Sequence, residues 1–182
     1  SYITGNMLID ARMKKDVKAF SNIEATYQAG SRATDSALRE IFLDFNIDRR
    51  MYFRTGKQVL QWGRCILWNP TDLINIEKKT FVRKIGYREG AYGMKVHIPF
   101  GTAYNIYGFF DTGNAGAGQD TAAALKFEFL TGRTEMAFSG WTKRGYSPVL
   151  GFDLSSRVRD IDIAGELSAS RNDTVKFMKN NL

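Results

Sequence analysis

Long apolar runs are missing from this chain of 182 residues, and no segment shows a convincing helical period. No stretch approaches the roughly 18 uninterrupted apolar residues that a membrane-spanning helix needs. This absence excludes a protein that crosses a membrane with helices. It does not exclude one that crosses with strands, because a spanning strand alternates apolar and polar residues over only about 9–11 positions.

Cysteine and histidine are scarce, with one residue of each, Cys65 and His97. One cysteine allows no internal disulfide, and a zinc site needs a cluster of such ligands. The stretch "VHIPF" around His97 is hydrophobic, whereas a triad-type hydrolase needs a histidine beside a serine. We therefore expect a protein that is not an enzyme, with no metal site and no cofactor.

Alternation of apolar and polar residues is the dominant pattern, and it recurs from one end of the chain to the other. In "LREIFLDFNIDRR" at 38–50, Ile41, Leu43 and Phe45 are apolar, whereas Glu40 and Asp44 are acidic. A period of two predicts strands, because successive side chains of a strand point to opposite faces. The pattern predicts one domain over 1–182 with ten strands, at about 4–13, 17–28, 37–47, 51–62, 91–99, 103–111, 122–130, 133–141, 149–155 and 158–169.

The connections between these strands alternate strictly between short and long. The odd strands are followed by "KKD", "DRR", "FGT", "TG" and "SR", and the even strands by longer segments. Outer-membrane barrels sort their loops in this way, whereas a Greek-key sandwich has no reason to do so. We predict an all-β, antiparallel up-and-down transmembrane barrel, or a fragment of one. The alternative is a soluble or surface β-sandwich or barrel that binds a ligand or partner.

In a transmembrane barrel the polar side of the alternation would line an aqueous lumen, and a wall of mixed charge would select solutes. The same charges could also simply pair across strands and satisfy one another. Lys57 falls on the apolar side by strict parity, so either a bulge shifts the register or Lys57 snorkels. The predicted lumen-lining residues are Asp10, Arg12, Glu24, Glu40, Asp44, Arg54, Gln58, Lys95, Lys126, Glu128, Glu135, Asp162 and Glu166.

The longest connection, at about 64–90, is too long for a hairpin loop, and its apolar content favours order over a solvated tail. We predict that it folds against the barrel mouth or into the lumen and narrows it, with basic residues that concentrate anions. The alternative is an outside cap that packs only on neighbouring loops. The predicted constriction residues are Arg64, Trp68, Asn69, Pro70, Asp72, Lys78, Lys79, Arg83 and Lys84.

The stretch "FRTGKQVLQWG" at 53–63, followed by "NPTDLIN" at 69–75, resembles a poorly characterised family of porin-like bacterial outer-membrane barrels. This family is related in style to alginate-export channels. The resemblance implies a location in the bacterial outer membrane and a role in transport or export, and it implies no particular substrate. It rests on Arg54, Gly56, Lys57, Gln58, Trp62, Gly63, Asn69, Pro70, Asp72 and Leu73.

The net charge of +7 is spread over turns, loops and the polar side of the strands. No strand carries the basic and aromatic stripe with which proteins bind single-stranded nucleic acid, so we expect no nucleic-acid partner. The expected partners are outer-membrane lipid and a small polar solute, whether anionic or not, or a polysaccharide. The excess charge would either keep the turns soluble and contact acidic envelope sugars or lipid phosphates, or make the lumen favour anions. The chain opens without a signal peptide and ends in "KFMKNNL" without a closing aromatic, so we expect a barrel that is incomplete at both ends.

Overall fold

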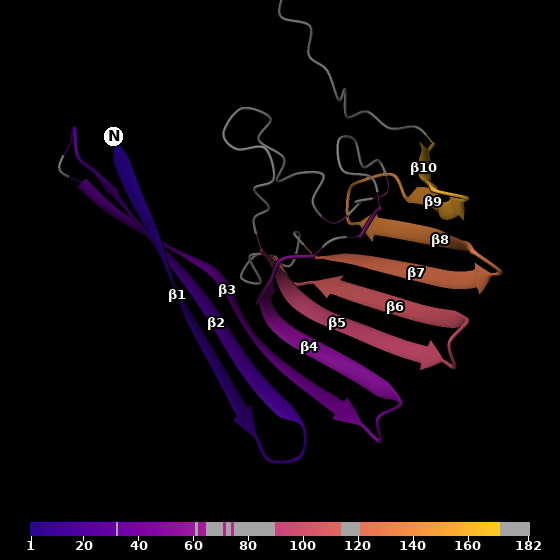
Figure 1. The fold of residues 1–182 in the computed structure, drawn as a ribbon, viewed down its shortest axis with the longest axis horizontal. Coiled ribbons are helices and arrows are strands. Elements are labelled where there is room, and N and C mark those ends of the chain that lie inside the picture. The colour runs from indigo at the N-terminus through magenta and orange to yellow at the C-terminus, as the bar shows by residue number, and fades with distance from the viewer. Residues whose placement is uncertain are drawn as a thin grey trace, which may run out of the picture.

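A computed structural model describes residues 1–31, 33–60, 62–64, 71, 74, 90–113 and 121–171. The described strands form one antiparallel sheet whose spatial order is the order of the sequence (Figure 1). The predicted all-β, up-and-down architecture is therefore confirmed. The strands are β1 (Tyr2–Met13), β2 (Val17–Gln28), β3 (Ala33–Ile47), β4 (Met51–Gln58), β5 (Ala91–Phe100), β6 (Tyr104–Asp111), β7 (Ala122–Thr131), β8 (Thr134–Lys143), β9 (Val149–Val158) and β10 (Ile161–Ser170). Within the described ranges, no helix has the length and apolarity to span a bilayer.

The turns after the odd-numbered strands are tight and lie along one end of the sheet (Figure 1). Each contains a residue with positive φ, such as Asp48 at 52° or Gly132 at 61°. This backbone conformation matches the right-handed twist of two paired strands. The last of these turns lies at 159–160 and not at the "SR" of 156–157, which corrects the sequence prediction. Alternation continues to the end of β9, so that Val158 pairs with Ile161.

The register divides the strand side chains between two faces, because residues directly opposite on paired strands lie on the same face. On one face, called here the apolar face, Leu43 pairs with Thr55 and Phe127 pairs with Phe138. Among the described strand residues, Lys57 is the one lysine, arginine, aspartate or glutamate that the register places on this face. We call the opposite side the polar face.

Lys57 keeps its regular position on the apolar face, and no bulge interrupts its pairing with β3 or β5. Its amine donates a hydrogen bond to the Leu38 carbonyl at 2.7 Å and lies 5.4 Å from the centre of the Tyr92 ring. The side chain therefore bends along the sheet to reach a polar group, as a snorkelling lysine does.

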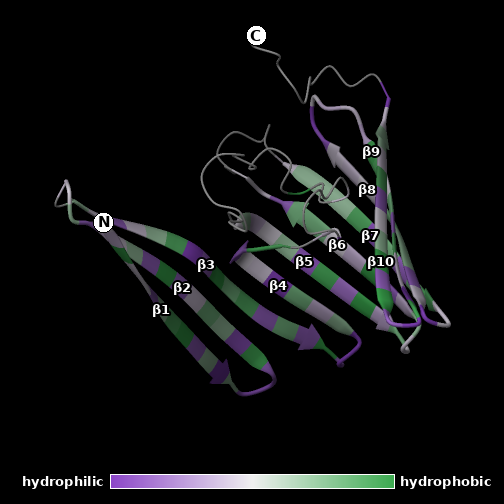
Figure 2. Cartoon of the chain, turned by 45° about the horizontal axis from the view of Figure 1, so that its top comes forward, coloured by the Kyte–Doolittle hydropathy of each residue, from purple (hydrophilic) through white to green (hydrophobic). Residues whose placement is uncertain are grey.

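Burial is inverted relative to that of a water-soluble sheet. Gln58 and Asp153 on the polar face are completely buried, whereas Leu125 and Leu150 on the apolar face are 60% and 68% exposed. Most of the exposed large apolar side chains lie on the apolar face. Figure 2 shows the alternation of hydrophobic and hydrophilic residues along the strands that divides them between the two faces. An apolar surface of this extent is unfavourable in water. The apolar face therefore needs a cover that the described residues do not supply.

The sheet is curved, and its edge strands β1 and β10 stand apart (Figure 2). The described residues include no strand that pairs with the outer edge of either. The polar face is on the inner side of the curve, because residues 62–64 contact strands from β6 to β10 across it.

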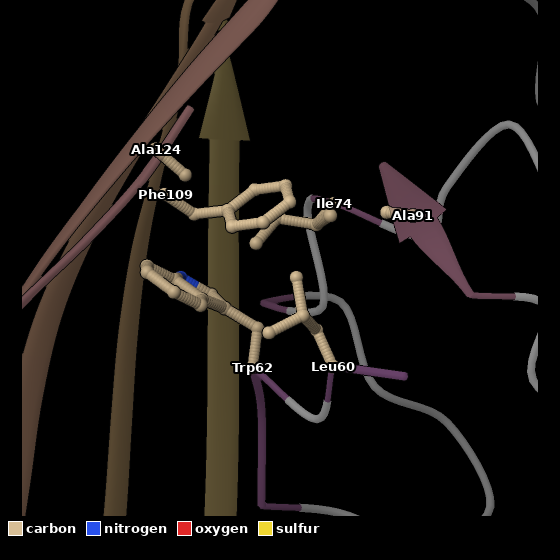
Figure 3. Packing of buried hydrophobic residues seen from close by; sticks show 6 residues of the cluster. All are labelled: Leu60, Trp62, Ile74, Ala91, Phe109 and Ala124. Carbon is tan, nitrogen blue, oxygen red and sulfur yellow. The ribbon is translucent and has the colours of Figure 1, made fainter. Parts of the chain in front are cut away.

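A small apolar cluster lies on this inner side, beyond the end of β4. Leu60, Trp62 and Ile74 pack there against residues of β5, β6 and β7, among them Phe109 (Figure 3). Strand β4 ends at Gln58 and does not continue to Trp62, contrary to the predicted strand at 51–62. The physical reason is this packing, in which Trp62 leaves the sheet and is only 4% exposed.

Candidate functional site

The polar face carries all thirteen residues that the sequence analysis predicted as lumen-lining. They come from eight of the ten strands, so the face is a continuous polar wall and not a local cluster. Their role in lining a lumen stays a prediction. The structure shows which opposite charges and hydrogen-bond partners compensate the charged side chains of this wall.

Ion pairs within the wall compensate several of the charges on β1 to β4. Arg54 binds the Asp44 carboxylate through two parallel hydrogen bonds of 2.6 and 2.8 Å, the geometry that makes arginine–carboxylate pairs strong. Its guanidinium also lies 3.9 Å from the centre of the Phe42 ring, which explains why an aromatic residue interrupts the polar side of β3. The pairs are Arg12–Asp10, Lys18–Asp10, Arg39–Glu24 and Arg54–Asp44, with closest N–O distances of 3.6, 3.0, 2.6 and 2.6 Å.

Carboxylates from four consecutive strands, β7 to β10, converge on Arg64. The guanidinium donates hydrogen bonds to Glu128 at 2.8 Å and to Glu135 at 2.6 Å. A third hydrogen bond goes to Asp153, and the backbone N–H of Arg64 donates to Glu166 at 2.5 Å. Carboxylates gathered this closely repel one another, so the positive charge among them stabilises the arrangement.

Two further residues tie the same region to the wall. The amine of Lys126 lies 3.1 Å from Asp153 and donates a hydrogen bond to the Trp62 carbonyl at 2.9 Å. Thr71 binds Glu166 twice, through its N–H at 3.1 Å and its hydroxyl at 2.8 Å. We call the described residues 59, 60, 62–64, 71 and 74 the inner segment. Polar and apolar contacts together hold it on the polar face.

The protonation of Arg64 is secured by its partners. Burial alone would lower the pKa of the guanidinium, but hydrogen bonds with Glu135 and Asp153 outweigh burial and raise the pKa above its ordinary value. Arg64 is therefore a permanent cation. If it were removed, the completely buried Asp153 would keep Lys126 as its remaining described ion-pair partner.

Of the predicted constriction residues, Arg64 contacts the polar face as described above. The remaining members of that prediction lie outside the described residues. They are Trp68, Asn69, Pro70, Asp72, Lys78, Lys79, Arg83 and Lys84.

Asp153 and Arg39 are two of the charged wall residues that are absent from the predicted lumen-lining set. Asp153 stands between Phe152 and Leu154, so the alternation itself carried the signal. Arg39 falls on the apolar side by strict parity, but the register shifts between Asn22 and its neighbour Ile23. The extra residue of β3 is thereby free to pair with Glu24 on the polar face. A bulge of this kind leaves no pattern in a single sequence.

No protein-family model matches the chain, and no curated protein matches it. The part of the chain that the structure describes also contains no group of three or more histidine, cysteine, aspartate or glutamate side chains placed to hold a metal ion. The chemistry that the described site does offer is that of a charged wall with a segment bound to it.

Replacing Arg64 by alanine should release the inner segment, because three carboxylates would lose their shared cation. Removing one partner of a buried ion pair costs about 3–5 kcal/mol. Release is measured by the rate at which a maleimide labels Cys65, the next residue and the only cysteine. We expect labelling to be faster than in the unaltered chain by about tenfold or more.

Arg157→Ala is the matched control for this experiment. It removes an arginine of the same face whose two hydrogen bonds with Asp162 measure 2.6 and 2.8 Å, but both side chains are about two-thirds exposed. Exposed pairs contribute about 0–1 kcal/mol, so labelling should stay unchanged. Equal labelling rates in both variants and the unaltered chain would mean that Arg64 does not hold the segment.

Proposed function

We propose that the chain forms the wall of a β-barrel channel of the bacterial outer membrane, through which small polar solutes pass or a polymer is exported. The observation that carries this proposal is the inverted burial of the sheet. Its apolar face is exposed and almost free of charge, whereas its polar face holds the buried residues. Lipid on the outside and water on the inside is the pair of environments that this distribution suits.

The apolar face supports contact with lipid in a second way. Lys57, its one charged side chain among the described strand residues, stands next to the end of β4 and reaches a backbone carbonyl. Long basic side chains near the ends of spanning segments commonly behave so. The backbone groups between neighbouring strands are paired within the sheet, which a bilayer requires.

Features of the polar face support the proposal of a water-filled lumen that the inner segment narrows. Its charges are arranged in pairs across strands, and the inner segment is bound to it by Arg64, Thr71 and Lys126. A segment held on the inner wall of a channel would reduce the bore and set which solutes pass. The soluble alternative would instead bury the apolar face and expose the polar one.

Contact with lipid can be tested with a pair of arginine substitutions. Leu125→Arg should destabilise the protein by about 2–4 kcal/mol if this residue of β7 lies near the bilayer midplane. In water the same position, 60% exposed, should tolerate arginine within about 0.5 kcal/mol. Ile161→Arg, beside the turn at 159–160, is the matched control and should cost only about 0–1 kcal/mol. Urea unfolding of the protein in lipid vesicles measures the change in the free energy of unfolding for each variant. A small destabilisation by both substitutions would argue against a lipid-facing sheet.

Channel activity can be tested in a planar lipid bilayer. The unaltered chain should produce discrete conductance steps, and Arg64→Ala should increase their size because the inner segment leaves the bore. Arg157→Ala should leave the conductance unchanged, since that residue binds no part of the inner segment in the described structure. A chain that gives no steps and stays monodisperse in water without detergent would support the soluble alternative.

A further inference from the structure

Lys95 lies in the interior of β5 on the polar face and has a neighbour of like charge. The register places it directly opposite Arg54 on β4 and opposite Phe109 on β6. Like charges directly opposite on adjacent strands are unfavourable. The side chain is also half-buried, so water screens the repulsion less than it would at an open surface.

The one carboxylate beside this pair is already engaged. Both oxygens of Asp44 accept hydrogen bonds from Arg54, from its Nε at 2.6 Å and its Nη2 at 2.8 Å. No carboxylate of the described residues lies within 4.0 Å of the Lys95 amine, whose recorded contact is the Tyr107 ring at 5.7 Å. Asp44, Arg54 and Lys95 together therefore leave one positive charge uncompensated.

Two hydrogen-bond donors beside Asp44, the Nη1 of Arg54 and the amine of Lys95, are available to a ligand. Arg54 donates to Asp44 through Nε and Nη2, and its Nη1 has no acceptor among the described residues. The Lys95 amine likewise has none there. Elsewhere on the same face, Lys126 shows the contrasting case, because its amine is occupied by Asp153 at 3.1 Å and by a carbonyl at 2.9 Å.

We propose that Arg54 and Lys95 form a binding site for an oxyanion, a carboxylate or phosphate group, on the inner wall. An oxyanion accepts hydrogen bonds from both side chains and compensates the excess charge, which neither a cation nor an uncharged sugar can do. Asp44 and the Phe42 ring, 3.9 Å from the guanidinium, act as positioning residues that fix Arg54. The proposal rests on the proposed function in one respect, since passage through the channel would bring the anion to this wall.

The test uses the full chain in detergent micelles, with inorganic phosphate as the probe and the ionic strength held constant. Titration followed by ³¹P NMR should show saturable binding, and Lys95→Gln should weaken the affinity for phosphate by about tenfold or more. Phosphate should raise the thermal unfolding midpoint of the unaltered chain by mass action and leave that of Lys95→Gln unmoved. Without phosphate, Lys95→Gln should unfold no earlier than the unaltered chain, because the like-charge pair is gone.

Two further variants make the result decisive. Lys18→Gln removes the same charge from the same face at a lysine already paired with Asp10 at 3.0 Å, and it should leave phosphate binding intact. Lys95→Arg keeps the charge and should keep the binding. Absence of saturable binding to the unaltered chain, or equal weakening by Lys95→Gln and Lys18→Gln, would overturn the proposal.

The outcome is separable from that of the channel experiment, because binding in micelles requires no conduction. A chain that binds phosphate at Lys95 but gives no conductance steps keeps the oxyanion site and contradicts the channel. A chain that conducts but binds no phosphate keeps the channel and contradicts the site.

Discussion

The convergence of four strands on Arg64 is the interaction on which the inner side of this sheet depends. Strands β7 to β10 bring Glu128, Glu135, Asp153 and Glu166 together, and this row of acids needs a cation. Lys126 of β7 supplies one positive charge, and Arg64, from the connection after β4, supplies the other and brings the inner segment with it. The polarity of the wall and the position of the segment are therefore coupled, because the segment carries the arginine that three of these carboxylates share.

This coupling also explains why the sheet buries what most sheets expose. Once polar groups on the inner side have partners, their burial is tolerated, as the completely buried Asp153 shows. The apolar side chains are left for the outer side, where Leu150 and Leu167 are exposed. The exposed apolar face of such a sheet is stable only in contact with an apolar environment. In the proposed membrane channel, the lipid acyl chains are that environment.

Much of the fold was predictable because alternation is local. Each strand carries its own period of two, so ten strands and the faces of most of their residues follow without knowledge of distant contacts. The ends of strands were less predictable: strand β4 was expected to extend to Trp62, but Trp62 packs with Phe109 on the polar side and leaves the sheet. The last tight turn was misplaced because Ser156 and Arg157 resemble a turn, while the ion pair of Arg157 with Asp162 closes a longer hairpin.

The candidate site was only partly predictable, for a physical reason. The sequence indicated which residues are polar and placed Arg64 in the long connection, but the partners of Arg64 depend on the curvature of the sheet. Arg64 and Glu166 are 102 residues apart, and no local period relates them. The uncompensated charge of Lys95 is equally hidden, because it follows from the pairing of β4 with β5 and from the choice of Asp44 as partner of Arg54.

Contact between the apolar face and lipid is measured most directly by spin labels placed in turn along β7, from Ala122 to Thr131, in a Cys65→Ser background. Each label is exposed in lipid vesicles to oxygen, which concentrates in lipid, and to a water-soluble nickel chelate. The predicted result is a period of two, with labels at Leu125 and Phe127 open to oxygen and shielded from nickel, and a label at Leu130, exposed on the polar face, showing the reverse. Equal access of the nickel chelate to labels on both faces would contradict a lipid-facing sheet.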